Sequence, residues 1–248
     1  MRRVKLTLSY DGSGYLGFQV QPGGPTVQSV TEEALSRILQ EPVKLRAAGR
    51  TDAGVHALGQ VVDFAVSGDR PLETVLRGGN ALLPADIRIL SASEVPESFN
   101  ARRDAKEKEY RYFLNLCPVA SPFFSRYAWH LEKPLDLDAI REGLAHVVGE
   151  HDFSSFRGQG CTAKTTTRTI YSAMLKKEEV SSLYSIRISG NGFLRYMVRN
   201  IVGTIVDVGK GKAQPERVRE LFSLRKRVEA GPTAPARGLF LWGVTYPG

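Results

Sequence analysis

The feature that most restricts the fold of this chain is the order of two hydrophobic periodicities over its first hundred residues. Apolar residues alternate over 4–11, which indicates a half-buried strand. They then recur at helical spacing over 26–40, with Thr26 as the expected N-cap. The remaining elements expected here are strands at 43–49, 59–66 and 86–95 and a helix at 71–83. The resulting order, β-α-β-β-α-β, is that of a ferredoxin-like domain.

The second half of the chain has similar ingredients. We expect, in order, a strand, a helix, a hairpin, two helices and a strand, at 109–116, 137–149, 168–190, 193–209, 215–224 and 238–246. No sequence repeat relates the two halves, so only the order of elements suggests a duplication. The sequence therefore predicts an α+β protein with two ferredoxin-like (RRM-like) domains, 1–104 and 105–248. Their antiparallel or mixed sheets are expected to join, with a basic cleft at the centre.

Charge is distributed unevenly between the halves. Residues 1–100 contain 10 Lys and Arg against 11 Asp and Glu, whereas residues 101–248 contain 24 against 15. The basic excess thus lies wholly in the second half, which favours a polyanionic partner, most simply nucleic acid. The alternative is a basic surface without such a partner.

Other features exclude several classes of protein. No run of eighteen apolar residues is present, and the basic start of the chain passes into strand-like alternation, so we expect neither a membrane span nor a signal peptide. Cys117 and Cys161 are isolated and the four histidines are scattered, so we expect buried or incidental thiols in a reducing cytoplasm and no metal.

A short stretch at 47–64, AAGRTDAGVHALGQVVDF, places a carboxylate on a tight turn between two expected strands. Gly49 and Gly54 allow backbone angles that other residues resist, so the chain can bend sharply here. Thr51 and Asp52 could simply stabilise such a turn through hydrogen bonds from side chain to backbone. The letters RTD alone leave this explanation open.

The longer string GRTDAGVHALGQVVDF resembles the signature of the TruA family of tRNA pseudouridine synthases, in which the aspartate is catalytic. The match over residues 49–56 is complete, and Gln60 and Phe64 also fit. Further stretches similar to family blocks lie at 10–28, 78–89, 98–114, 192–203 and 234–246. The resemblance therefore runs almost from end to end.

The resemblance implies a catalytic role for three residues. Asp52 would attack the sugar or remove a proton from it, Arg199 would be its charge partner, and Tyr110 would stack on the target uracil and help to remove the C5 proton. Without the resemblance, Tyr110 reads as a core residue of a strand and Arg199 as a surface arginine on a basic helix whose Gly203 allows close backbone approach.

The resemblance also implies how RNA is bound. Arg50 would contact the flipped nucleotide or fill the space that it leaves. The residues expected to contact RNA are Arg50, Gln60, Arg102, Tyr110, Lys164 and Arg168. The sequence departs from the family pattern at Asn100, where histidine is frequent, and at Arg195 and Tyr196, where histidine or asparagine is frequent. These departures concern fine specificity and not the reaction.

Pseudouridine formation breaks the N1–C1′ bond of uridine, rotates the uracil and rejoins it through C5. Nothing is oxidised and no group is transferred in, so we expect no cofactor. The resemblance implies the anticodon stem-loop of tRNA as substrate, uridines 38, 39 and 40 as targets, a homodimer and a cytoplasmic location.

Two other classes of protein remain as alternatives. A non-catalytic RNA-binding module could use the same fold and charge. A glycoside hydrolase would need two carboxylates flanking the scissile bond, and the same stretch offers Asp63 besides Asp52. We expect Asp63 to be structural or solvent-facing.

Overall fold

The computed structural model describes residues 1–180 and 182–247, which divide into two compact units. Unit 1 comprises Met1–Lys106 and the segment from Phe240 onward, and unit 2 comprises Glu107–Leu239. The division after Lys106 lies close to the expected boundary at 104/105. The end of the chain differs from expectation, because the last strand belongs with the first unit and not with the second half.

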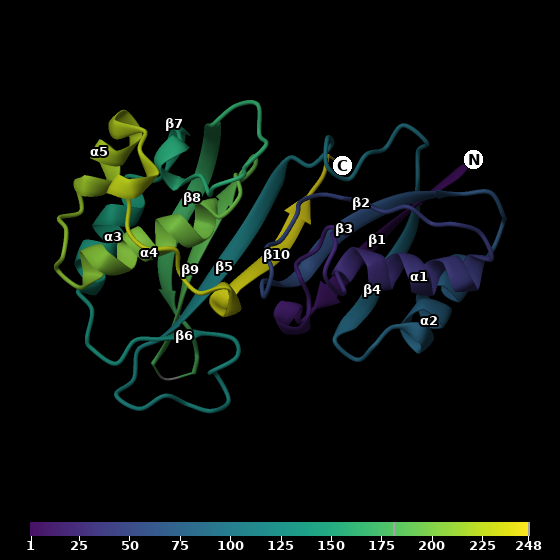
Figure 1. Ribbon diagram of the computed structural model, residues 1–248, viewed down its shortest axis with the longest axis horizontal. Helices are drawn as coiled ribbons and strands as arrows, with labels where there is room; N and C mark the ends of the chain where they lie inside the picture. Colours follow the sequence, from purple (N-terminus) through teal and green to yellow (C-terminus); the bar gives the residue numbers. More distant parts are fainter. Residues whose placement is uncertain (181, 248) are drawn as a thin grey trace. The chain divides into compact units, whose positions relative to one another are not determined.

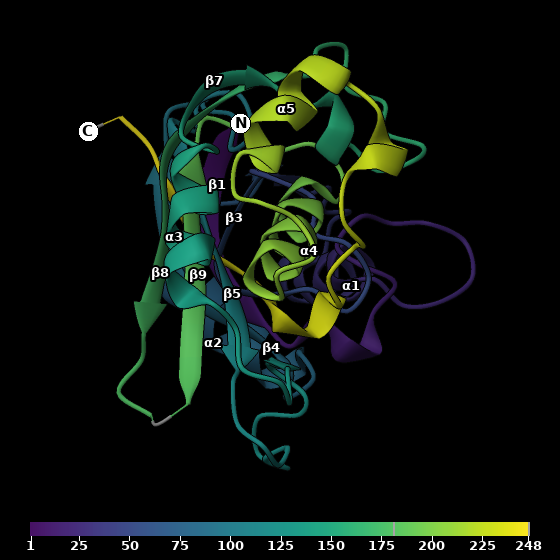
Figure 2. The same ribbon diagram turned by 90° about the vertical axis from the view of Figure 1, so that its left-hand side faces the viewer.

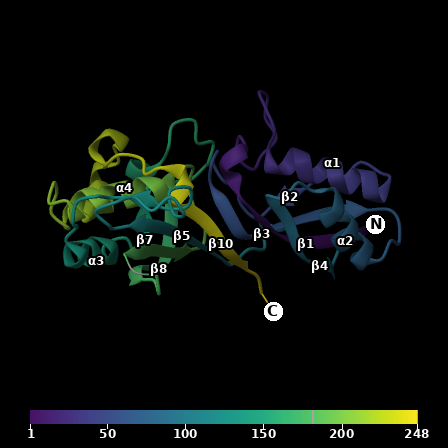
Figure 3. The same cartoon turned by 90° about the horizontal axis from the view of Figure 1, so that it is seen from below.

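Unit 1 is built on an antiparallel sheet in which β1 lies between β4 and β3 (Figure 1). Its elements are β1 (Arg2–Tyr10), α1 (Val27–Leu39), β2 (Arg46–Ala47), β3 (His56–Val66), α2 (Leu72–Leu82), β4 (Ile87–Val95) and β10 (Leu239–Thr245). The other edge of β3 has two partners: β10 runs parallel to it at His56 and Ala57 (Figure 3), and β2 pairs with Val62 and Asp63. The ring of Phe240 stacks on His56, with centroids 4.6 Å apart.

Local sequence accounts for the first elements of this unit. Alternate residues of β1 are buried from Val4 to Tyr10, as the alternation predicted. The helix α1 begins after the expected N-cap, where the Thr26 side chain accepts from Ser29 N and Ser29 Oγ accepts from Thr26 N. This reciprocal arrangement satisfies amide groups that lack a partner in the first turn. The two helices pack against each other, and α2 packs on β4.

In unit 2, the strands β5, β9, β8 and β7 are neighbours in this order and pair antiparallel, and β6 pairs parallel to β5. Its elements are β5 (Glu107–Asn115), β6 (Trp129–His130), α3 (Leu137–Ala145), β7 (Gly149–Asp152), β8 (Thr167–Lys177), β9 (Leu183–Gly190), α4 (Met197–Gly209) and α5 (Arg217–Leu224). The helix α3 packs on β8 and against α4 (Figure 2), and most residues of α4 are buried. With helices and mainly antiparallel strands in both units, the protein is α+β.

Several boundaries differ from expectation. The strand expected at 43–49 is reduced to Arg46–Ala47, because Val43 N and Leu45 N donate to Ser36 Oγ and a Glu32 carboxylate oxygen of α1 instead of to a strand.

The helix expected at 137–149 ends at Ala145, and Gly149, with a φ of +112°, begins a strand. The helix expected at 193–209 begins only at Met197, because Tyr196 has a left-handed backbone conformation. Within the described residues, no helix is long and apolar enough to cross a membrane.

Candidate active site

Asp52 begins a tight turn that connects β2 to β3. Its carbonyl oxygen accepts a hydrogen bond from Val55 N at 3.1 Å, and Gly54, the third residue of the turn, has a φ of +75°. A positive φ at this position is typical of type II turns and favours glycine. Asp52 is only partly buried, between a buried Thr51 and an exposed Ala53. The turn thus fixes the backbone of a carboxylate residue that the fold does not enclose fully.

Hydrogen bonds of two buried side chains, Tyr10 and Gln60, anchor this turn to β1 and β3. The hydroxyl oxygens of Tyr10 and Thr51 lie 2.8 Å apart, and Gln60 Nε2 donates to Gly49 O at 2.8 Å and to Tyr10 Oη at 3.4 Å. Burial raises the pKa of Tyr10 to about 12, so its phenol is neutral near pH 7. Within the described part of the chain, Gln60 Oε1 is buried without a hydrogen-bond partner.

Two glycines let the segment after β1 lie directly against the turn. Gly17 has a φ of +98°, and a Cβ there would lie 2.8 Å from Thr51 O, to which the neighbouring Phe18 N donates at 3.1 Å. A Cβ at Gly12 would lie 2.0 Å from Val55 O. Backbone approaches as close as these are possible only for glycine. The turn is therefore held at both ends by a second segment of unit 1.

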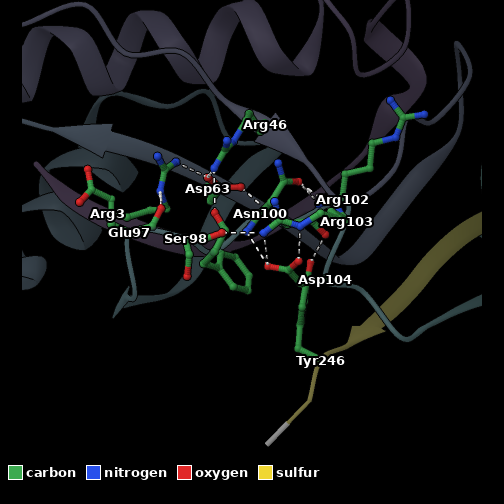
Figure 4. Close-up of polar contacts among 12 residues, drawn as sticks. Arg3, Arg46, Asp63, Glu97, Ser98, Asn100, Arg102, Arg103, Asp104 and Tyr246 are labelled. Carbon is green, nitrogen blue, oxygen red and sulfur yellow. Dashed lines mark hydrogen bonds and ion pairs between the residues drawn. The ribbon is translucent and has the colours of Figure 1, made fainter.

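The second carboxylate of the motif, Asp63, is fully buried in β3 (Figure 4). Its Oδ2 accepts from Arg3 Nη1 at 2.7 Å and from Arg46 Nη2 at 2.5 Å, and its Oδ1 accepts from Ala101 N at 2.8 Å. The expectation of a structural residue agrees with these contacts, and that of a solvent-facing one is wrong. A carboxylate bound in this way cannot be the second acid of a glycosidase pair, which has to face the substrate.

The segment that follows β4 exposes two neighbouring arginines, Arg102 and Arg103. The Asn100 side-chain oxygen accepts from the backbone amides of Arg102 and Arg103 at 3.0 and 3.1 Å. Arg103 is paired with Asp104, whereas the side chain of Arg102 extends away from this cluster (Figure 4). Asn100 therefore shapes the loop through its amide, and Arg102 remains a candidate for RNA contact.

In unit 2, Tyr110 is buried on β5, with its ring edge-on to Phe193 and centroids 4.9 Å apart. Tyr112 lies on the same face of the strand and donates its hydroxyl to Pro235 O at 2.8 Å. Burial strongly raises the pKa of Tyr112, and the positive charge of Arg199 opposes this effect. Tyr112 is thus a core residue, as expected, and Arg199 is near enough to influence it.

Arg199 lies in the first turn of α4, and its guanidinium is oriented by the chain segment that crosses this helix. Its Nε donates to Ala234 O at 2.7 Å, and its Cζ lies 5.0 Å from the ring centroid of Tyr196. The segment can approach because of Gly203, where a Cβ would lie 1.6 Å from Pro232 O. The close approach expected at Gly203 is therefore confirmed, and it supplies the carbonyl that holds Arg199.

The remaining candidate RNA-binding residues differ in exposure. Arg50 and Lys164 are exposed, and Arg168 is partly buried at the start of β8. Arg168 Nη1 donates to Thr165 O at 3.1 Å, and burial lowers the pKa of this arginine. Gln60 has no exposed surface, so its visible role is to hold the turn.

Sequence reasoning missed the residues that hold this site in place. Tyr10 and Gly17 belong to a stretch that resembles a family block, so a signal existed, although it did not reveal their contacts with the turn. Ala234 acts through its backbone carbonyl, which no side-chain pattern indicates. Among the described residues, no group of three or more His, Cys, Asp or Glu side chains could hold a metal ion.

Comparison with known proteins identifies the family. A family model described as tRNA pseudouridine synthase matches residues 7–103 and 144–247. Curated relatives named tRNA pseudouridine synthase A include that of Pelobacter propionicus, 49% identical over 99% of this chain and 100% of the relative. The relative from Geobacter sulfurreducens is 46% identical over 99% of this chain and 100% of the relative. The relative from Neisseria gonorrhoeae is 48% identical over 100% of this chain and 93% of the relative.

A solved archaeal box H/ACA sRNP Nop10-Cbf5 complex aligns with a TM-score of 0.38 and 16% identity, over 82% of this chain and 44% of that chain, a likeness too low to carry an argument. The sequence matches define the class of protein: pseudouridine synthases, isomerases that convert uridine to pseudouridine. Within this class, the chain belongs to the tRNA pseudouridine synthase A (TruA) family. An isomerase therefore replaces both alternatives, the RNA-binding module and the glycoside hydrolase.

Proposed function

We propose that this chain isomerises uridines 38, 39 and 40 in the anticodon stem-loop of tRNA, with Asp52 as the catalytic residue. Family membership supports the reaction, and the names of the relatives support tRNA as substrate. One observation in this chain carries the choice of Asp52: its turn is held by hydrogen bonds with Tyr10 and Gln60 and by two glycine contacts. A reactive group gains most from being fixed in advance relative to its substrate.

The reaction gives an ionised carboxylate two possible roles. Asp52 could attack C1′ as N1 departs, forming a sugar ester that C5 of the rotated uracil later displaces. It could instead take the proton from C2′, giving a glycal to which it returns that proton when C5 bonds to C1′. In both routes C5 loses a proton, N1 gains one and the carboxylate is regenerated.

We propose Arg199 and Tyr110 as the partners of Asp52 in this chemistry. A guanidinium favours the charged form of a carboxylate and can bind it through two parallel hydrogen bonds. The orientation of Arg199 by Ala234 and Tyr196 supports this role. Tyr110 would stack on the uracil, a contact worth about 1–3 kcal/mol per base, and assist removal of the C5 proton.

The target uridine has to leave its helical stack to reach a carboxylate, which costs a few kcal/mol. We propose that the exposed Arg50, two residues from Asp52, contacts the flipped nucleotide or fills its place. Arg102, Lys164 and Arg168 would bind phosphates, which position the RNA without reading its sequence. Gln60 would contribute through the Gly49 carbonyl, by keeping the turn in place.

We further propose that both units have the ferredoxin-like arrangement and that the protein is a cytoplasmic homodimer. In unit 1, the antiparallel order β4-β1-β3-β2 with helices after β1 and β3 supports the ferredoxin-like arrangement.

The proposed homodimer rests on the family resemblance. Light scattering of the purified protein tests it, since a monomer at micromolar concentration would contradict the proposal.

A tritium-release assay tests the catalytic proposal. Unmodified tRNA carrying tritium at uracil C5 is incubated with the wild type, with Asp52→Ala and with Asp69→Ala, a fully exposed aspartate of unit 1 that serves as the matched control. We expect release by the wild type and by Asp69→Ala and none by Asp52→Ala. Equal release by wild type and Asp52→Ala would refute the role of Asp52.

A second experiment tests the target positions. Uridine is replaced by cytidine at position 38, 39 or 40 in separate tRNA substrates, and each substrate should release less tritium by the amount that comes from the replaced position.

A further inference from the structure

Tyr196, the residue just before α4, has a backbone conformation that its side chain disfavours. Its φ is +61° and its ψ is 0°, in the left-handed region that glycine and asparagine visit far more readily than tyrosine. Strained residues persist where their surroundings determine them fully, and they cluster at functional sites. The contacts of the Tyr196 ring show which side-chain arrangement this backbone conformation holds in place.

The ring of Tyr196 is confined by two guanidinium groups and a glycine. The Cζ atoms of Arg195 and Arg199 lie 4.9 and 5.0 Å from the ring centroid. A Cβ at Gly158 would lie 2.3 Å from Cδ2 of the ring, and Gly158 N donates to Arg195 O at 2.8 Å. A side chain at position 158 would therefore displace the ring, which has little freedom to move.

The confined ring acts on Arg199 in a way that a hydrogen-bond acceptor could not. An aromatic face attracts a guanidinium without using any of its N–H donors. One donor, Nε, is already bound to Ala234 O. The carbonyl and the ring together restrict the position of the guanidinium, and the ring itself occupies none of its N–H donors.

We infer that Tyr196 is a positioning residue for the reaction: its left-handed backbone places its ring where it orients the guanidinium of Arg199. The inference rests on the proposed function, because it takes Arg199 to be part of the catalytic site. It assigns a role to one of the positions at which this sequence departs from the family pattern.

The substitution Tyr196→Asn tests the ring apart from the backbone, since asparagine adopts the left-handed conformation readily. We expect kcat for tritium release to fall about tenfold, with KM for tRNA within about twofold and a melting temperature within a few degrees of the wild type. Tyr196→Phe keeps the ring and should restore most of the kcat. Tyr171→Asn, at a half-exposed tyrosine of β8, is the matched control and should leave kcat unchanged.

A second variant tests the position of the ring. Gly158→Ala should push the ring aside and lower kcat severalfold in the wild-type background, but should have no further effect when combined with Tyr196→Asn. Independent, additive effects of the two substitutions would contradict the inference.

The outcomes also separate this inference from the proposed function. If Tyr196→Asn keeps the wild-type kcat while Arg199→Gln has a lower kcat, the inference about Tyr196 is overturned and the proposed function stands. Wild-type kcat in Arg199→Gln overturns the proposed role of Arg199 and the inference with it. A loss in Tyr196→Asn that disappears when rates are expressed per folded molecule overturns the inference too, because it would show a purely structural role.

Discussion

Asp52 and Asp63 lie eleven residues apart in one motif, and the fold treats them differently. The side chain of Asp63 is fully buried and accepts hydrogen bonds from two arginines and a backbone amide, so it holds these groups together. The turn of Asp52 is instead held by its neighbours, through the Tyr10–Thr51 contact and the hydrogen bond from Gln60 to Gly49 O. The carboxylate of Asp63 is thus fixed through its own oxygens, and the turn that carries Asp52 is fixed through contacts of the neighbouring residues.

The contrast predicts that Asp52→Asn separates activity from stability. Because the contacts described for the turn are made by neighbouring residues, the melting temperature should stay within about 2 °C of the wild type. The kcat for tritium release should fall at least about a thousandfold, since an amide can neither attack C1′ nor take a proton. Marked destabilisation would break the comparison by making Asp52 structural as well.

The matching change, Asp63→Asn, should have the opposite outcome. Loss of the buried charge leaves Arg3 and Arg46 without their shared partner, so the free energy of unfolding should fall by about 3 kcal/mol. The kcat per folded molecule should stay within a fewfold of the wild type. Urea unfolding and single-turnover rates measure the two quantities. A thousandfold lower kcat in the folded enzyme would show that Asp63 also takes part in the chemistry.

Gly17→Ala tests whether the turn of Asp52 depends on its neighbours. The added Cβ would lie 2.8 Å from Thr51 O at a residue whose φ is +98°, so we expect about 2 kcal/mol of destabilisation and a kcat about tenfold lower. Gly14→Ala is the matched control in the same segment, because a Cβ there meets no atom within 4 Å. If both variants behave alike, the close approach of this segment does not position the turn.

The smallest effect concerns pH. Tyr10 has a folded-state pKa of about 12, above its ordinary value of 10.0, because burial disfavours the phenolate. The stability that this adds is fully present below pH 10 and is lost as the pH rises from 10 to 12. Wild-type stability should therefore fall more steeply over this range than that of Tyr10→Phe, measured by urea unfolding. Parallel curves would show that Tyr10 does not couple the turn to pH.

Periodicity predicted the elements in which side-chain burial decides the structure. The alternation of β1 and the helix beginning after Thr26 are confirmed, because in each element the spacing of the apolar residues shows which face is buried. Prediction was wrong where backbone groups bind elsewhere: the amides of Val43 and Leu45 bind side chains of α1, which shortens the expected strand. The left-handed Tyr196 likewise delays the start of α4, and no local pattern indicates it.

The sequence predicted which residues belong to the candidate site, but it did not predict the contacts that hold them in place. The resemblance pointed to Asp52, and the structure adds what a motif does not contain: which atoms hold its turn. Gln60 was expected at the RNA and is found with no exposed surface, hydrogen-bonded to Gly49 O, a distinction that depends on three-dimensional burial. The carbonyl of Ala234 was not predictable either, because backbone groups are the same in every residue.

The last strand of unit 1 comes from the far end of the chain, and this has a consequence for the order of synthesis. Residues from Phe240 onward emerge from the ribosome after all of unit 2, yet they pair with β3 at His56, close to the turn of Asp52. A nascent chain therefore carries the turn for most of translation without the strand that flanks it. Unit 1 can be completed only when synthesis reaches its last residues, so we expect growing chains to be inactive on the tRNAs that surround the ribosome.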